Sequence, residues 1–188
     1  MRFSTSGGPT TRFGTREYTD LTIGGDGLLY ALTGSAVDVY NPGAGDAFVR
    51  TINFAAGVSS GDIRGIAVAS NGRLYAAGWN GTVYEVSSAG ALLNSRPTGA
   101  NNLTDIDLND LNQLLVGSRF GNVILTDVTL ASQTSFTVAG GPTIHVAWTT
   151  PLTVPEPAAI AVIGSAALLL RRSRRNRGMG VSPMRPPL

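Results

Sequence analysis

The chain has no cysteine and no lysine, and only one of its 188 residues is histidine. Without cysteine it can form no disulfide, no thiolate metal site and no cysteine nucleophile. A single histidine excludes a multi-histidine metal centre within one chain. Charged residues make up 14% of the sequence, against about a quarter in ordinary soluble proteins. The sequence therefore offers few of the side chains on which enzymes usually depend.

The positive charge is concentrated at one end. Residues 1–154 carry eight arginines and eleven acidic residues, whereas residues 155–188 carry six arginines and one acidic residue, Glu156. A protein that binds nucleic acid places its basic residues on the folded body. We therefore expect no nucleic-acid partner. The hydrophobic content of 43% is enough to form a core, which argues against a disordered chain.

A repeat of about 40 residues runs through residues 18–150. The segment Ile66–Tyr75 aligns with Ile106–Leu115 and, in the other direction, with Leu21–Tyr30, and Val146–Trp148 begins a further copy. The first and third positions of every copy are apolar, which is the alternation of a β-strand. A period of this length is typical of propeller blades.

Three more strands are expected in each copy. We expect type I′ turns at Asp26-Gly27 and Asn71-Gly72, because both central residues of that turn need positive φ, with Leu111-Asn112 in the third copy. The expected strands are Leu29–Leu32, Val37–Tyr40 and Phe48–Phe54, then Leu74–Ala77, Val83–Val86 and Leu92–Arg96, then Leu114–Gly117, Val123–Thr126 and Ser135–Val138.

The sequence thus predicts an all-β fold, a propeller-like array of about three four-stranded blades plus one strand, Thr143–Thr149, followed by a C-terminal apolar helix. A β-sandwich, which has strands at similar spacing, is the alternative. Leu29-Tyr30 and Leu74-Tyr75 resemble the Gly/Asn-x-Leu-Tyr pattern of YVTN/NHL-like propellers. Propellers usually close with roughly four to eight blades. We therefore expect part of a larger propeller, with apolar faces exposed at both ends and self-association of residues 1–150.

Three polar side chains alternate with apolar ones at Asp105, Asp107 and Asn109, so they share one strand face. This spacing is similar to the start of a calcium loop, but Asp110 and Val116 stand where that loop needs glycine and glutamate. We therefore predict no metal site and no cofactor here. The side chains are expected to line the blade interface or the central channel.

The single histidine, His145, aligns with Asp105, Gly65 and Asp20 at the start of an inner strand. No second histidine or nearby acid in sequence accompanies it, so a structural or channel-lining role is favoured over that of a catalytic base. The weak channel or ligand candidates are Asp105, Asp107 and His145, and no catalytic residue is predicted. Trp79 is expected to pack between blades rather than to bind sugar.

The chain is expected to divide into a flexible N-terminal segment (1–17), the propeller-like domain (18–150), a proline-rich linker (151–157), a membrane helix (158–170) and a basic cytoplasmic tail (171–188). The apolar run 158–170 is shorter than the span of about 20 residues that a bilayer needs. Flanking arginines can extend such a helix by snorkelling and keep their own side cytoplasmic. The arginines that would stop the membrane helix are Arg171, Arg172, Arg174, Arg175 and Arg177.

The motif Val154, Pro155, Glu156, Pro157, followed by an apolar helix and an arginine cluster, resembles the PEP-CTERM sorting signal of exported bacterial proteins. The resemblance implies transient insertion in the inner membrane, processing by an exosortase and release to the cell surface or the extracellular matrix, where polysaccharide is a possible partner. We expect a binding or structural protein and not an enzyme, because Asp20, Asp105, Asp107 and His145 are the main polar side chains at channel positions. The alternative is an exported propeller enzyme, a lactonase or lyase. Residues 1–20 contain no apolar stretch of the kind found in a secretory signal peptide.

Overall fold

The computed structural model describes residues 2–3, 9–11, 14 and 16–148. It divides the chain into two compact units, Met1–Trp148 and Thr149–Leu188, and the described residues all belong to the first. The expected linker, the membrane helix 158–170 and the basic tail 171–188 lie outside the described residues. In the part of the chain that is described, no helix is long and apolar enough to cross a membrane.

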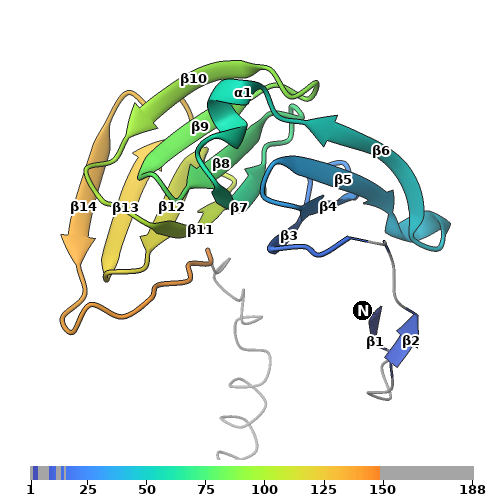
Figure 1. The fold of residues 1–188 in the computed structure, drawn as a ribbon, viewed down its shortest axis with the longest axis horizontal. Coiled ribbons are helices and arrows are strands. Elements are labelled where there is room, and N and C mark those ends of the chain that lie inside the picture. The colour runs from blue at the N-terminus through green and yellow to red at the C-terminus, as the bar shows by residue number, and fades with distance from the viewer. Residues whose placement is uncertain (1, 4–8, 12–13, 15, 149–188) are drawn as a thin grey trace, which may run out of the picture. The chain divides into compact units, whose positions relative to one another are not determined.

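Three four-stranded antiparallel sheets follow one another along the chain (Figure 1). Blade 1 consists of β3 (Asp20–Ile23), β4 (Leu29–Leu32), β5 (Ala36–Asn41) and β6 (Ala47–Asn53). Blade 2 consists of β7 (Ile63–Val68), β8 (Leu74–Gly78), β9 (Thr82–Val86) and β10 (Leu92–Pro97), and blade 3 of β11 (Leu103–Leu108), β12 (Gln113–Ser118), β13 (Asn122–Asp127) and β14 (Gln133–Thr137). Each sheet is a meander of consecutive strands, as the propeller reading predicts and the sandwich reading does not. The all-β prediction and the three blades are confirmed.

The remaining elements are short. A 3₁₀ turn, η1 (Pro42–Ala44), connects β5 to β6, and a single helical turn, α1 (Ala56–Ser59), connects blade 1 to blade 2. In the segment 1–17, which is expected to be flexible, β1 (Arg2–Phe3) and β2 (Pro9–Thr11) form a two-stranded sheet of their own.

The expected extra strand, Thr143–Thr149, is described as far as Trp148 and runs beside β11 without joining a sheet. The backbone N–H of Ile144 donates to the carbonyl of Ser118 at 2.9 Å, and the Thr104 hydroxyl donates to the carbonyl of Ile144 at 2.7 Å. This segment therefore lies where the first strand of a fourth blade would begin.

The turns between the first and second strands of the blades differ from the expected type. Positive φ is found at only one residue of each turn, at Gly27 (75°), Gly72 (78°) and Asn112 (59°). The backbone N–H of each donates to a carbonyl three residues earlier, which is a type I turn followed by one left-handed residue. Asp26 and Asn71 keep the ordinary right-handed conformation because their side chains accept the N–H two residues on, at 3.0 Å in both. The prediction of type I′ turns was wrong, although the turn positions were right.

Two hydrophobic clusters hold the blades together. The first lies between blades 1 and 2 and contains Tyr30, Val39, Ile66 and Leu74 among others, and all four are at most 1% exposed. The second lies between blades 2 and 3 and is built in the same way around Tyr75, Val83, Ile106 and Leu114. Blade 2 thus buries both of its faces, whereas blades 1 and 3 each bury one face against a described neighbour.

Gly65 sets the closest approach of blade 2 to blade 3. A Cβ atom at this position would lie 2.8 Å from the Cα of Asp105 and 3.0 Å from its carbonyl carbon. Both atoms belong to the backbone and cannot rotate away, so any larger residue would push the two inner strands apart.

We expect Gly65→Ala to lower the free energy of unfolding by roughly 1–3 kcal/mol, because it overpacks a backbone contact. Gly57→Ala in α1 is the control, since its Cβ would meet only the Leu92 side chain at an ordinary 3.6 Å. Urea denaturation of the full chain measures both. Equal midpoints for Gly65→Ala and the parent would show that the blades do not meet at this glycine.

Candidate functional site

Two candidate sites bring polar side chains together on the body, an inner edge formed by the first strands of the blades and a cleft on blade 1. The inner edge contains the sequence candidates Asp105, Asp107 and His145, together with Asp20. The cleft contains residues that sequence analysis did not single out. The geometry of each decides what it can do.

The aspartates of the inner edge bind backbone N–H groups. Asp20 accepts the N–H of Leu21 with Oδ1 at 2.8 Å, and with Oδ2 it accepts the N–H of Ile66, in the first strand of the next blade, at 2.7 Å. Asp105 repeats this arrangement with Ile106 at 2.9 Å and Val146 at 2.9 Å. Asp20 therefore links β3 to β7, and Asp105 links β11 to the segment 142–148.

Asp107 does the same one step further along β11. Its Oδ1 accepts the N–H of Leu108 at 2.8 Å, and its Oδ2 accepts the N–H of Trp148 at 2.6 Å. Asp105 and Asp107 together hold the segment 142–148 against blade 3. Their alternation along the strand, which resembles the start of a calcium loop, serves a backbone contact in the structure.

His145 lies next to this edge with its side chain 76% exposed and its Nδ1 3.6 Å from Oδ2 of Asp105. The pKa of Asp20 is raised above its usual 3.8, chiefly because burial disfavours the charged form, although the N–H groups of Ile66 and Leu21 oppose this. The charge of Asp105 adds to the rise and that of His145 reduces it. The structure thus brings Asp20, Asp105 and His145 together, as their aligned positions in the repeat imply.

Among the described residues, no group of three or more histidine and acidic side chains is arranged to hold a metal ion. At the inner edge, both carboxylate oxygens of each aspartate accept a hydrogen bond from a backbone N–H. These carboxylates are placed to fix the strands, and only His145 presents a mostly exposed titratable side chain there.

The raised pKa of Asp20 has a measurable consequence. Between the ordinary value of 3.8 and the higher folded value, the folded state holds a proton that the unfolded state has lost, so the free energy of unfolding falls as the pH rises. Asp20→Asn has no such proton. We expect the stability of the parent minus that of Asp20→Asn to decrease as the pH rises above the ordinary value of 3.8, measured by denaturant titration at several pH values. A difference that stays constant with pH would contradict the burial of this carboxyl.

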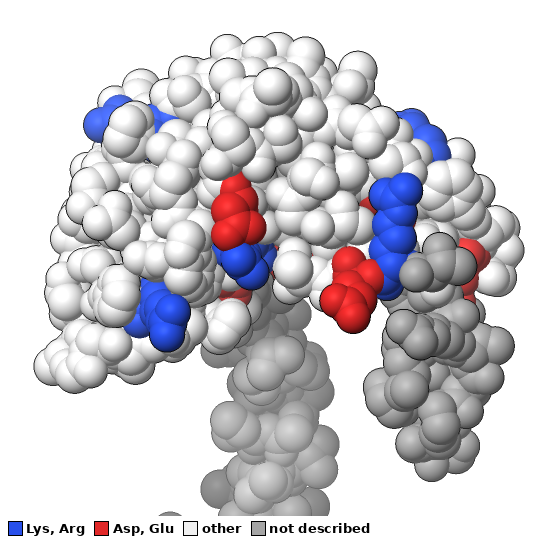
Figure 2. Space-filling model, in the orientation of Figure 1, with Lys and Arg blue, Asp and Glu red and all other residues white. Residues whose placement is uncertain are grey.

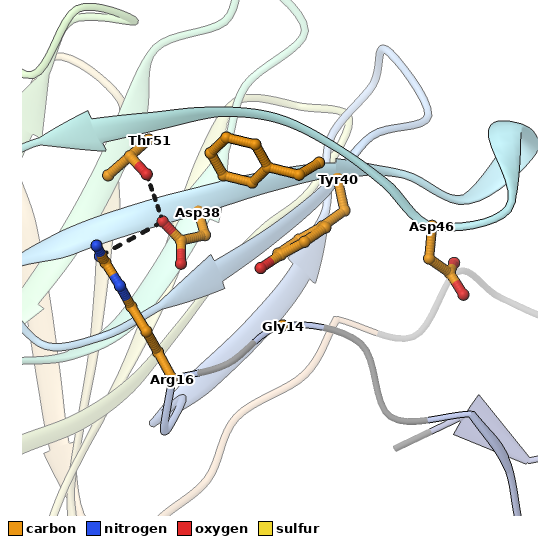
Figure 3. Close-up of a pocket in the computed structure, with 7 residues that line it drawn as sticks. Gly14, Arg16, Asp38, Tyr40, Asp46 and Thr51 are labelled. Atoms are coloured by element: carbon orange, nitrogen blue, oxygen red, sulfur yellow. Dashed lines mark hydrogen bonds and ion pairs between the residues drawn. The ribbon is translucent and has the colours of Figure 1, made fainter.

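The second site is a cleft of about 530 Å³ on blade 1 (Figure 3). Its walls come from β5, from β6 with the turn before it, and from the segment preceding β3. The lining residues are Gly14, Arg16, Asp38, Tyr40, Asp46, Phe48 and Thr51. Figure 3 shows Asp38 between Thr51 and the guanidinium of Arg16, with Tyr40 further along the same strand.

Asp38 is the centre of this cleft and is only 3% exposed. Its Oδ1 accepts the hydroxyl of Thr51 at 2.6 Å and lies 3.6 Å from the guanidinium of Arg16, and its Oδ2 accepts the hydroxyl of Tyr18 at 3.1 Å. A buried carboxylate needs such partners because an unpaired charge in the interior is very unfavourable. The cleft therefore contains a polar cluster on one face of a sheet, in which the hydrogen-bond acceptors of Asp38 have partners.

Tyr18 closes the cluster from the segment before β3. Its hydroxyl lies 2.7 Å from that of Tyr40, and the two rings meet edge to face. Burial and the hydrogen bonds with Tyr40 and Asp38 raise the pKa of Tyr18, so it remains a neutral hydroxyl at neutral pH. When Tyr18 donates to Asp38, Tyr40 is the donor to Tyr18.

Sequence analysis missed Asp38 although a signal was present. In the repeat, Asp38 takes the position of Tyr84 in blade 2 and Ile124 in blade 3, both of which are buried. A lone acid at a position that is apolar in the other two copies marks the face of blade 1 as different. The tyrosine at position 18, which supplies a hydrogen bond, carries no comparable signal, because it lies outside the repeated strands.

Trp79 lies half-buried in the β8–β9 turn, with two arginines against its ring. The guanidinium carbons of Arg64 and Arg119 are 5.2 and 5.7 Å from its ring centroid, which are cation–π distances. Arg119 comes from the corresponding turn of blade 3, so the contact joins two blades. Figure 2 shows that the basic side chains on the face it presents are separated from one another, and that some of them lie beside acidic side chains.

No known protein family and no curated protein matches this sequence. Solved structures do resemble the fold. The WD40 repeats of RRP9 and the structure of U3-55K each match with 13% identity and a TM-score of 0.58, over 71% of this chain and 42% and 43% of their own. A streptogramin B lyase matches with 11% identity and a TM-score of 0.50, over 63% of this chain and 40% of its own. These likenesses show a β-propeller fold, and the chain spans about two-fifths of the length of the propellers it matches.

Proposed function

We propose that this chain is an exported binding or structural protein of the bacterial cell surface or extracellular matrix, whose propeller body is delivered by a C-terminal sorting signal. The observation that carries the proposal is the order of three sequence features, Val154–Pro157, an apolar run over 158–170 and five arginines within 171–177. This order resembles the PEP-CTERM signal, and each feature alone is common.

The arrangement of the chain supports this reading. The last described contact of the body is made by Trp148, and the motif begins six residues later. In the sequence, the motif therefore follows the folded body closely and directly precedes the apolar run. The body itself carries more acidic than basic residues, so the arginines after the apolar run are the strongest orienting charges and favour a cytoplasmic end of the tail.

The proposal assigns the body a binding or structural role and not catalysis. The carboxylates of Asp20, Asp105 and Asp107 bind backbone N–H groups, and the oxygens of Asp38 bind side-chain donors. These hydrogen bonds favour a structural role for the carboxylates, because they hold the side chains against the protein's own donors. Extracellular polysaccharide is the class of partner that the sorting signal suggests, and exosortase is the partner in processing.

We expect Glu156→Ala to prevent removal of the tail, because it destroys the proposed recognition motif while leaving the body intact. The test places the chain behind a signal peptide in a host that has an exosortase and compares the masses of the exported proteins. Thr153→Ala, one residue before the motif, is the matched control and should be processed like the parent. Normal processing of Glu156→Ala would refute the sorting proposal.

An exported propeller enzyme is the second candidate, and one observation favours it. His145, the only histidine, lies 3.6 Å from Asp105 at the inner edge, and a streptogramin B lyase is among the similar folds. Elemental analysis of the purified chain separates the two candidates. We expect no divalent ion in a one-to-one ratio with the chain. A bound ion that is lost in both His145→Ala and Asp105→Asn would favour the enzyme.

A further inference from the structure

The two outer faces of the three-blade array are the starting point. We call the side of a blade that is turned toward the preceding blade its front face, and the opposite side its back face. The front face of blade 1 and the back face of blade 3 lie at the two ends of the array, on either side of blade 2 (Figure 1). The repeat shows what each face meets elsewhere in the same molecule.

On the front face of blade 1, apolar side chains are exposed at positions that are buried in the other blades. Leu21 is 50% exposed, whereas its counterparts Ile66 and Ile106 are 1% and 3% exposed. Ile23 and Phe48, on the same face, are 59% and 58% exposed. In blades 2 and 3 this face is covered by the back face of the preceding blade, so the repeat itself identifies the kind of surface that fits here.

The back face of blade 3 also has an apolar side chain exposed at a position that is buried in another blade. Phe136 pairs with Val123 in the sheet and is 57% exposed. The corresponding residue of blade 1, Ile52, pairs with Val37 and is 3% exposed because blade 2 covers it. Within the described residues, no blade covers the front face of blade 1 or the back face of blade 3.

We propose that the front face of blade 1 packs on the back face of blade 3 of a second copy of this chain, and that the reciprocal contact closes a ring of two copies. Six blades fall within the range of about four to eight with which propellers close. Each copy spans 42% and 43% of the WD40 proteins it matches, so two copies approach one whole propeller. The inference uses only the body and does not depend on the sorting signal.

Side chains of the same copy cover the middle of the front face of blade 1. The contact with the second copy is therefore expected at the edges of this face. Tyr18 covers Asp38 and Tyr40 there through hydrogen bonds. Leu21 and Ile23 remain for the inner part of the contact, and Phe48 remains for the outer part. The cleft on blade 1 is thus the part of the front face that Tyr18 and Arg16 do not cover.

The segment 142–148 holds the inner position on blade 3 in a single copy. The N–H of Val146 meets Asp105 as the N–H of Ile66 meets Asp20. Leu21 is the counterpart of Ile66, so in the ring the N–H of Leu21 from the second copy leaves its own Asp20 and takes the place of Val146 at Asp105. Residues 142–148 leave this edge when the two copies join.

The experiment measures the number of protein chains per particle by analytical ultracentrifugation of the full chain in a mild detergent. We expect two copies for the parent. Leu21→Glu spoils only the front face and Phe136→Glu only the back face, and each should weaken association at least about tenfold, since a charge is placed in an apolar contact. Both residues are exposed in one copy, so circular dichroism and melting should match the parent. Leu111→Glu, at a turn residue that is 77% exposed, is the control.

Mixing the two variants is the decisive step. One intact front face and one intact back face remain, so the mixture should form a pair with a single junction and grow no further. The proposal would be overturned by a parent that stays single at micromolar concentration, by variants that both stay paired because another segment joins the copies, or by a mixture that fails to pair. Loss of pairing by Leu21→Glu alone would indicate front-to-front contact and would also overturn it.

Discussion

The fold depends on burying one sheet face against the next. Each blade has two largely apolar faces, and a sheet of four short strands gains most of its stability only when both are covered. Blade 2 meets this condition, with Ile66 and Leu74 packed on blade 1 and Tyr75 and Val83 packed on blade 3. The hydrogen bonds of Asp20 and Asp105 then fix the offset between neighbouring inner strands, which apolar contacts alone leave free to slide.

The same constraint explains the unusual face of blade 1. A carboxylate on a face that another apolar blade covers would be buried without a partner. Asp38 is tolerated because Thr51 comes from the neighbouring strand and Tyr18 and Arg16 reach it from the segment before β3. The polar cluster therefore supplies the partners that this carboxylate needs, and it covers only the centre of the face.

The strands were predictable because alternation of apolar residues survives in every copy, and β4 begins and ends where the pattern predicts. The turn type was not, because Asp-Gly and Asn-Gly fit two hairpin geometries and the choice depends on a side-chain hydrogen bond such as that from Arg73 to Asn71. Asp105 and His145 were singled out from the alignment of the repeat. The role of Asp105 was not predictable, because its acceptor function depends on Val146 lying beside it after folding.

The residue at the position of Gly65 makes blade 2 differ from blades 1 and 3. Blades 1 and 3 carry aspartate at this position and reach the next strand through a carboxylate, whereas blade 2 carries none and touches the backbone of blade 3 directly. Placing the sequence of blade 2 in either other slot would remove a hydrogen-bonded link, and placing an aspartate in its own slot would force a clash. The three blade sequences are therefore not interchangeable. The order in which they occur along the chain is itself part of the information that specifies the fold.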